Sequence, residues 1–131
     1  MELRVIEKIR TSNFNDEHLM RKIMDMWKEA SSVLSNKNEN VYGLYHEYES
    51  DYTGYYTLCV AIEDPNESTI VIPKEIKYEI FKVNTNDEQG IFNTWNEIWK
   101  KEEEGHLKRA YTFDFEKYYP DGEIDIYIAI I

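Results

Sequence analysis

The sequence predicts an α+β fold in which a strand–helix–strand–strand unit occurs twice about a pseudo-twofold axis. The first observation is an internal repeat. When Trp27 is aligned with Trp99, the segment "NFNDEHLMRKIMDMW" lies opposite "NTNDEQGIFNTWNEIW". The second observation is that "YGLYHEYESDYTGYYTLCVAI", at 42–62, aligns with "YTFDFEKYYPDGEIDIYIAI", at 111–130. Together they predict one antiparallel sheet built from both repeats, with two helices on one face and a cleft on the other.

The length and composition indicate a single folded domain. A chain of 131 residues can form one hydrophobic core but not two independent ones. We therefore expect one domain over residues 1–131, with a first repeat at about 1–63 and a second at about 74–131. No apolar run approaches the ~20 residues needed to span a bilayer, and the N-terminus lacks a basic leader followed by an apolar stretch. We expect no membrane association and a cytoplasmic location.

The first repeat is expected to begin with a strand over residues 2–9, where apolar residues alternate. A helix capped by Asn15 or Asp16 should follow, because the next apolar residues have helical spacing: Leu19, Ile23, Met26 and Trp27. The polar segment 35–40 predicts a loop after it. Two Tyr-rich strands, at 41–49 and 55–62, are joined by "SDYTG", which is typical of a hairpin turn.

The second repeat is expected to contain a strand at 76–83, a helix at 88–104 and strands at 109–118 and 123–130. In its last strand the isoleucines alternate with polar or small residues, so one face should pack against the helices. That row is Ile124, Ile126, Ile128 and Ile130, and the matching row of the first repeat is Tyr56, Leu58, Val60 and Ile62.

Tyrosines and carboxylates are expected to share the helix-free face. Alternation places Asp114, Glu116 and Tyr118 on one side of their strand, where the repeat matches them with Tyr45 and Glu47. We favour the interpretation that this side is also the side of the acidic residues in the last strand. A solvated face would more usually carry Lys, Glu, Thr and Ser, so this mixture indicates a binding surface.

The segments "VYGLYHEYESDYTGYYTLCVAIE", "IFNTWNEIWK" and "AYTFDFEKYYPDGEIDIYIAI" resemble the effector-binding domain of AraC- and MerR-type regulators. The same gyrase-inhibitor-like superfamily includes stand-alone integron cassette proteins. The resemblance covers nearly the whole chain, and its most specific parts are the Trp-x-x-x-Trp helix and the acidic last strand. The chain departs from the pattern by ending in "YIAII" where many relatives have a proline.

The resemblance implies a receptor for amphipathic, often cationic, organic molecules, which aromatic rings sandwich and buried carboxylates neutralise. When the family's ligand site is carried over to this sequence, Glu116 and Glu123 match the carboxylates that neutralise the ligand. Tyr45 and Tyr127 match the aromatic rings that enclose it. Combined with the face pattern, the candidate ligand-binding residues are Tyr45, Glu47, Tyr55, Trp95, Trp99, Asp114, Glu116, Tyr118, Glu123, Asp125 and Tyr127.

The chemistry of these residue types suits a cation. A buried carboxylate is costly unless it is paired, and each aromatic ring adds roughly 0.5–2 kcal/mol of cation–π attraction. Two plainer interpretations stay open. The acidic residues would lie on a solvated face with tyrosines as strand formers, and Trp27, Trp95 and Trp99 would pack on the sheet, with one ring at the edge of the cleft.

The net charge of −11 argues against direct binding of nucleic acid, which requires a basic surface. A cationic ligand suits this charge better. We see no helix-turn-helix segment before the domain, so a regulatory role would need a separate regulatory protein as partner. The sequence leaves the oligomeric state open.

No catalytic residue, metal site or cofactor is expected. Cys59 is the only cysteine, and the three histidines have no metal-ligand spacing. The main alternative function, which the resemblance to gyrase-inhibitor-like proteins implies, is a hydrolase of electrophilic small molecules. Glu116 would be its general base and Tyr45 or Tyr127 its proton donor. A third possibility is an acidic protein that inhibits a DNA-binding enzyme through its charge.

Overall fold

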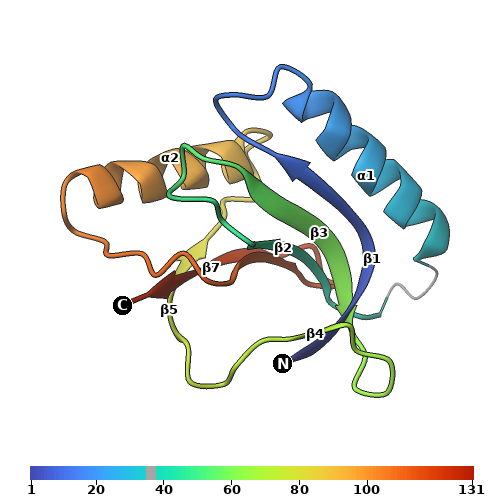
Figure 1. Cartoon of the computed structure of the whole chain (residues 1–131). Coiled ribbons are helices and arrows are strands. Elements are labelled where there is room, and N and C mark those ends of the chain that lie inside the picture. The colour runs from blue at the N-terminus through green and yellow to red at the C-terminus, as the bar shows by residue number, and fades with distance from the viewer. Residues whose placement is uncertain (35–37) are drawn as a thin grey trace.

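The protein has an α+β fold in which two helices lie on one side of a curled, seven-stranded antiparallel sheet (Figure 1). The computed structural model describes residues 1–34 and 38–131; the predicted loop at 35–40 therefore lies partly outside the described residues. The strand order is β4-β1-β3-β2-β6-β7-β5. The fold class predicted from the sequence is confirmed.

The first half of the chain forms one strand, one helix and a hairpin, followed by a short edge strand. These elements are β1 (Glu2–Thr11), α1 (Leu19–Val33), β2 (Val41–His46), β3 (Tyr56–Glu63) and β4 (Ile70–Val71). The N-cap of the helix is His18 rather than Asn15 or Asp16 as predicted, because Asp16 binds the chain before the helix. Its carboxylate accepts the His18 N–H at 2.9 Å. β4 was not predicted, since two residues give no periodic signal.

The second half repeats the order of strand, helix, strand and strand. Its elements are β5 (Lys77–Lys82), α2 (Gly90–Glu103), β6 (Asp114–Tyr118) and β7 (Ile124–Ile130). β6 is shorter than the predicted strand at 109–118. Arg109 makes only an isolated bridge to Ile130, and Tyr111 has a positive φ of 55° that interrupts an extended chain. Neither helix of the described chain is long and apolar enough to cross a membrane.

The helices cover the two apolar rows that strand alternation predicted. Under α1, Met26 and Ala30 form a buried cluster with Tyr56, Leu58 and Val60. Under α2, the buried residues Trp95, Ile98, Ile126 and Ile128 form a second cluster. Each fully buried large apolar side chain contributes roughly 1.5–3 kcal/mol, so these clusters hold both helices on the same face.

Most of the helix-free face is a packed core, so the described residues form no large cavity where the sequence predicted the ligand cleft. Tyr42, Leu44 and Phe115 are buried there, with Tyr127 packed against them. The rings of Phe115 and Tyr127 stack with their centroids 4.6 Å apart. The chain after β4 adds Ile72, which is buried in the same cluster. This leaves the helix side of the sheet as the place for a large cavity.

The two halves meet where β2 pairs with β6, and this register decides which way Glu116 points. Glu116 lies opposite Gly43 on β2 and opposite Ile126 on β7. Directly paired residues share a face, so Glu116 shares the face of the isoleucine row, beneath the helices. The predicted grouping of Glu116 with Glu123 on the helix-free face is therefore wrong.

Candidate functional site

A cavity of about 830 Å³ lies between the two helices and the sheet. This volume is in the range of small-molecule sites. α1 contributes apolar side chains such as Met20 and Ile23, and the sheet contributes the floor. The cavity is lined by many aromatic rings, which are Phe14, Trp27, Tyr45, Tyr48, Tyr52, Tyr56, Phe92, Trp95, Trp99 and Tyr118.

Glu116 is the carboxylate at the floor of this cavity, and its residue is 5% exposed. Its Oε2 accepts hydrogen bonds from the Tyr45 hydroxyl at 2.9 Å and from Trp95 Nε1 at 2.8 Å. Its Oε1 accepts one from the Tyr118 hydroxyl at 2.7 Å. Within the described chain, no basic side chain forms an ion pair with it. Neutral donors alone therefore hold the carboxylate.

Burial raises the pKa of Glu116, and the three hydrogen bonds oppose this by favouring the charged form. The pKa values of the two tyrosines that donate to Glu116 are also raised. Burial, followed by the charge of Glu116, raises the pKa of Tyr45 and of Tyr118 well above the ordinary value. Both phenols therefore stay neutral and act as hydrogen-bond donors.

A glycine makes room for this carboxylate. Gly43 on β2 is paired directly with Glu116, and a Cβ atom there would lie 3.0 Å from Glu116 Oε1. It would also lie 3.7 Å from Cζ2 of Trp27. The missing side chain thus leaves room for the Glu116 carboxylate, which accepts hydrogen bonds from Tyr45 and Tyr118.

We expect Gly43→Ala to disturb this arrangement. The added methyl must push Glu116 away from Tyr118, and overpacking of this kind costs about 1–2 kcal/mol of unfolding free energy. Urea unfolding would measure the loss. Unchanged stability, with an unchanged fluorescence spectrum of the tryptophans, would show that the pocket does not depend on this close approach.

The aromatic walls stand on both sides of Glu116. On one side the Tyr45 ring lies 5.1 Å from that of Trp95, and on the other the Trp27 ring lies 5.2 Å from that of Tyr118. Trp99 extends the first wall, with its ring 6.3 Å from that of Trp95. The sequence indicated Trp95 and Trp99 as candidate ligand-binding residues, with core packing as the plainer alternative; in the structure Trp27, Trp95 and Trp99 all line the cavity.

A buried ion pair lies beside the cavity. Arg109 lines the cavity, and its Nη2 lies 2.8 Å from Oδ2 of Asp114, which is fully buried. The other Asp114 oxygen accepts the Ala129 N–H at 2.7 Å, and the Tyr48 hydroxyl donates to Asp114 as well. Burial opposes the charge of Arg109, but Asp114 outweighs this and the pKa of the guanidinium is raised.

Arg109 is therefore occupied by a protein carboxylate and is not free to neutralise Glu116. Its guanidinium carbon lies 4.4 Å from the centre of the Tyr111 ring, which covers it. Nε and Nη1 have no hydrogen-bond partner among the described residues, although Nη1 lies 3.7 Å from a Glu102 carboxylate oxygen. This pair was not predicted from the sequence, because Arg109 lies outside the regular strands and no periodic pattern indicates that its side chain reaches Asp114 at the start of β6.

Of the candidates predicted from the sequence, the structure brings one group together at the cavity. These residues are Tyr45, Trp95, Trp99, Glu116 and Tyr118. The remaining candidates do not line it. Asp114 points to the same face but is held by Arg109, and Tyr127 belongs to the core of the helix-free face.

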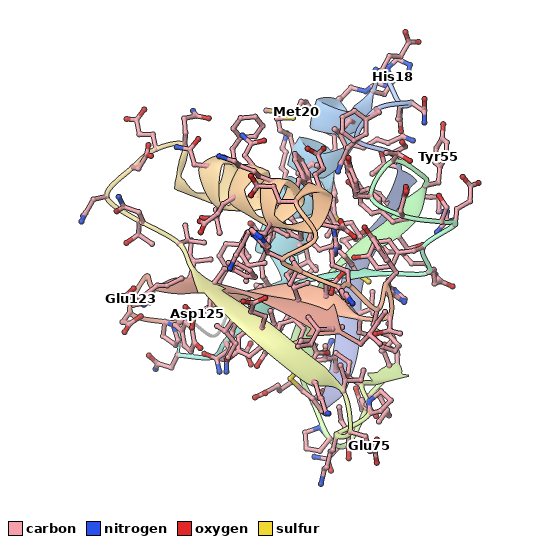
Figure 2. The ribbon with its side chains drawn as sticks, turned by 90° about the vertical axis from the view of Figure 1, so that its left-hand side faces the viewer. His18, Met20, Tyr55, Glu75, Glu123 and Asp125 are labelled. Carbon is pink, nitrogen blue, oxygen red and sulfur yellow. The ribbon has the colours of Figure 1, made fainter. Side chains whose placement is uncertain are left out.

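The other candidates, which are Glu47, Tyr55, Glu123 and Asp125, lie away from this cavity. Glu123 and Asp125 both contact Lys82 on β5, at 2.8 Å and 3.9 Å. In Figure 2 their side chains lie beside that strand, below the helices, whereas Met20 projects near the top. Glu47 is exposed with a φ of 52°, and the Tyr55 hydroxyl donates to the Asn15 carbonyl at 3.3 Å.

A smaller cavity of about 410 Å³ is lined by His46 and Cys59, among others. Cys59 Sγ lies 3.4 Å from His46 Nε2. Burial raises the pKa of the Cys59 thiol to about 12 and lowers that of His46, so the thiol stays protonated and unreactive. Among the described residues, no group of three or more His, Cys, Asp or Glu side chains could hold a metal ion.

The sequence and the fold are similar to those of one protein family and of individual proteins related to it. The profile of a family described as "Integron-associated effector binding protein" (Cass2) matches residues 6–130. A Bacillus subtilis (strain 168) protein named "Putative transcriptional regulator protein YobU" is 29% identical over 141 residues, covering 92% of this chain and 87% of that protein.

The crystal structure of an integron cassette protein, VCH_CASS2 from the mobile metagenome of Vibrio cholerae, has the same fold. Its TM-score is 0.74 at 28% identity, with 100% of this chain and 92% of that chain covered. These similarities confirm the resemblance predicted from the sequence. The chain belongs to the family of integron-associated effector-binding proteins.

Proposed function

We propose that this protein, which is a ligand-binding, regulator-like domain, binds amphipathic organic cations in the cavity between its helices and its sheet. One observation carries the proposal. Glu116 is a buried carboxylate with only neutral partners, and it lies on the floor of an aromatic cavity. Tyr45, Trp95, Trp99 and Tyr118 would form the walls against which the ligand stacks.

The energetics favour a cation over a neutral ligand. A buried carboxylate without a counter-charge is destabilising, and a cation that enters the cavity compensates it. Each ring that faces the cation adds roughly 0.5–2 kcal/mol, with larger values where water is excluded. Stacking tolerates different ligand shapes, so we expect a receptor for a class of flat or quaternary cations.

The test is a titration with tetramethylrosamine, a planar organic cation. All three tryptophans line the cavity, so bound dye should quench tryptophan fluorescence in a saturable way. Dye anisotropy should rise over the same concentration range. Absence of saturable binding of tetramethylrosamine, and also of ethidium and tetraphenylphosphonium, would refute the proposal.

The affinity should depend on pH through Glu116. Because burial raises the pKa of this carboxyl, protonation removes its charge at a higher pH than for an exposed glutamate. Affinity should be constant at high pH and fall by up to about tenfold per pH unit below the pKa of the free site. The same titration of Glu116→Gln should show no such step. A pH-independent affinity of the wild type would contradict the role of Glu116.

Hydrolysis is the second candidate function. The raised pKa of Glu116 and its contact with two phenols also suit a general base beside a proton donor. A cationic ester, tetramethylrhodamine methyl ester, separates the two functions. A hydrolase would convert it with water into the free acid and methanol, whereas a receptor would bind it and release it unchanged.

The receptor could act in regulation through a partner. A bound cation would neutralise Glu116 and join α1 to α2 across the cavity, which supplies a physical difference between the free and bound states. A separate DNA-binding protein that recognises the bound state would convert ligand capture into a signal. Co-purification of such a partner only in the presence of ligand would support this role.

A further inference from the structure

The cavity contains a second carboxylate–aromatic cluster near the C-terminal end of α2. Glu103 lines the cavity there, and its Oε1 accepts the Tyr52 hydroxyl at 3.0 Å. The Tyr52 ring stacks on Trp99, with centroids 6.0 Å apart and an interplanar angle of 22°. We name Glu103, Tyr52, Trp99 and Phe14 the outer cluster.

Phe14 completes this outer cluster from the loop before α1. Its ring lies 5.9 Å from that of Tyr52 and 6.2 Å from that of Trp99. Phe14 is 59% exposed, and Glu103 is exposed as well. The outer cluster therefore lies at a solvent-exposed part of the cavity, whereas the site around Glu116 is buried.

The two clusters have the same chemistry and are joined by one row of rings. Tyr45, Trp95 and Tyr118 donate hydrogen bonds to Glu116. In the outer cluster Tyr52 donates to Glu103 and its ring stacks on Trp99. Trp95 and Trp99 are neighbours on α2 with centroids 6.3 Å apart. Glu103 lies eight residues beyond Trp95, which corresponds to about 12 Å along a helix.

We propose that the cavity takes elongated ligands with two cationic groups, one at Glu116 and one at the outer cluster. This inference rests on the proposed function, because it assigns a second subsite of the same cavity. The apolar middle of the ligand would lie along Trp95 and Trp99. Two linked cations bind with the second contact made within the same complex, so both carboxylates contribute to a single affinity.

The charge of the cavity supports two cations rather than one. Arg109, the basic residue among those lining the cavity, is already paired with Asp114. Three carboxylates, Glu88, Glu103 and Glu116, also line the cavity, and a single small cation offers only one charge to them. Glu103 and Glu116 are the two that accept hydrogen bonds from aromatic side chains of the lining. An aliphatic bis-cation places each charge against a carboxylate and against rings that attract it.

The test compares bis(trimethylammonium)alkanes, from butane to dodecane, with decyltrimethylammonium, a single cation of similar length, by isothermal titration calorimetry. In the wild type we expect an optimum at the octane to decane members, which should bind about tenfold more tightly than the single cation. Glu103→Gln should abolish this preference, so that the bis-cations and decyltrimethylammonium bind with about equal affinity. The affinity for decyltrimethylammonium itself should stay nearly unchanged.

The control variant is Glu104→Gln. Glu104 is the exposed neighbour of Glu103 and does not line the cavity, so the variant removes the same charge without touching the subsite. It should keep the tenfold preference. An equal loss of preference in both variants would show general attraction to an acidic protein and would overturn the inference.

Failure of the inference differs from failure of the proposed function. If decyltrimethylammonium and tetramethylrosamine bind in a way that needs Glu116, but the bis-cations bind no more tightly, only the second subsite is refuted. If none of these cations binds, the proposed function fails with it. A preference that does not change with chain length would also refute the second subsite.

Discussion

Replacing Glu116 with Gln is expected to weaken binding of tetramethylrosamine about a hundredfold. Loss of one partner of a buried charge pair costs roughly 2–5 kcal/mol, and Glu116 supplies the buried charge at the floor of the cavity. Gln has nearly the same shape, so the aromatic walls and the cavity should stay in place. Tryptophan quenching and dye anisotropy would measure the loss.

The same variant should not lose stability at neutral pH through this charge. Burial raises the pKa of Glu116 in the folded protein. The unfolded chain therefore loses this proton at a lower pH than the folded chain does, and the free energy of unfolding falls as pH rises between the two pKa values. Gln has no such penalty, although it cannot accept all of the present hydrogen bonds.

A control variant separates the local charge from the overall charge. Glu97 is exposed on α2 and does not line the cavity, so Glu97→Gln should keep wild-type affinity. Retention of full affinity in Glu116→Gln, with urea midpoints that show both variants folded, would refute the carboxylate site. Equal losses in both variants would indicate non-specific attraction instead.

Replacing Asp114 with Ala should give the largest loss of stability, about 3–5 kcal/mol. Asp114 is fully buried and accepts hydrogen bonds from Arg109, Tyr48 and the Ala129 N–H. Its removal leaves the guanidinium of Arg109 buried without its partner, and this uncompensated charge is the main cost. Urea unfolding, followed by circular dichroism, would measure the change.

A double variant tests this explanation. Removing both charges with Arg109→Met and Asp114→Leu should recover most of the stability, because two apolar side chains of similar size do not need each other as partners. A double variant as unstable as Asp114→Ala would show that the hydrogen bond to the Ala129 N–H, rather than the charge of Arg109, causes the loss. The result decides what holds the segment before β6.

The sequence alone determined the elements and their apolar faces. The Trp27–Trp99 alignment and the Tyr-rich segments predicted two sets of strand, helix, strand and strand, and the structure contains these elements in that order. The isoleucine row faces α2 as strand alternation required. These features depend on local spacing, which is visible in one chain. The repeat boundaries at about 1–63 and 74–131 stay a prediction.

The position of the cavity was decided only by the tertiary structure. Alternation places Asp114, Glu116 and Tyr118 on one side of a strand, but it does not say which side faces the helices. That choice depends on the register of β6 with β7, which pairs Glu116 with Ile126. Pairing of the two halves through β2 and β6 then places Gly43 against Glu116.

The rest of the site consists of residues whose neighbours are remote in the sequence. Phe14, Tyr52 and Arg109 come from irregular segments, where no period indicates the direction of a side chain. Their roles follow from contacts across the fold, such as the Tyr52 ring on Trp99. The sequence therefore determined the residue chemistry and the strands that carry it, and only the packing of helices on the sheet brought that chemistry into one cavity.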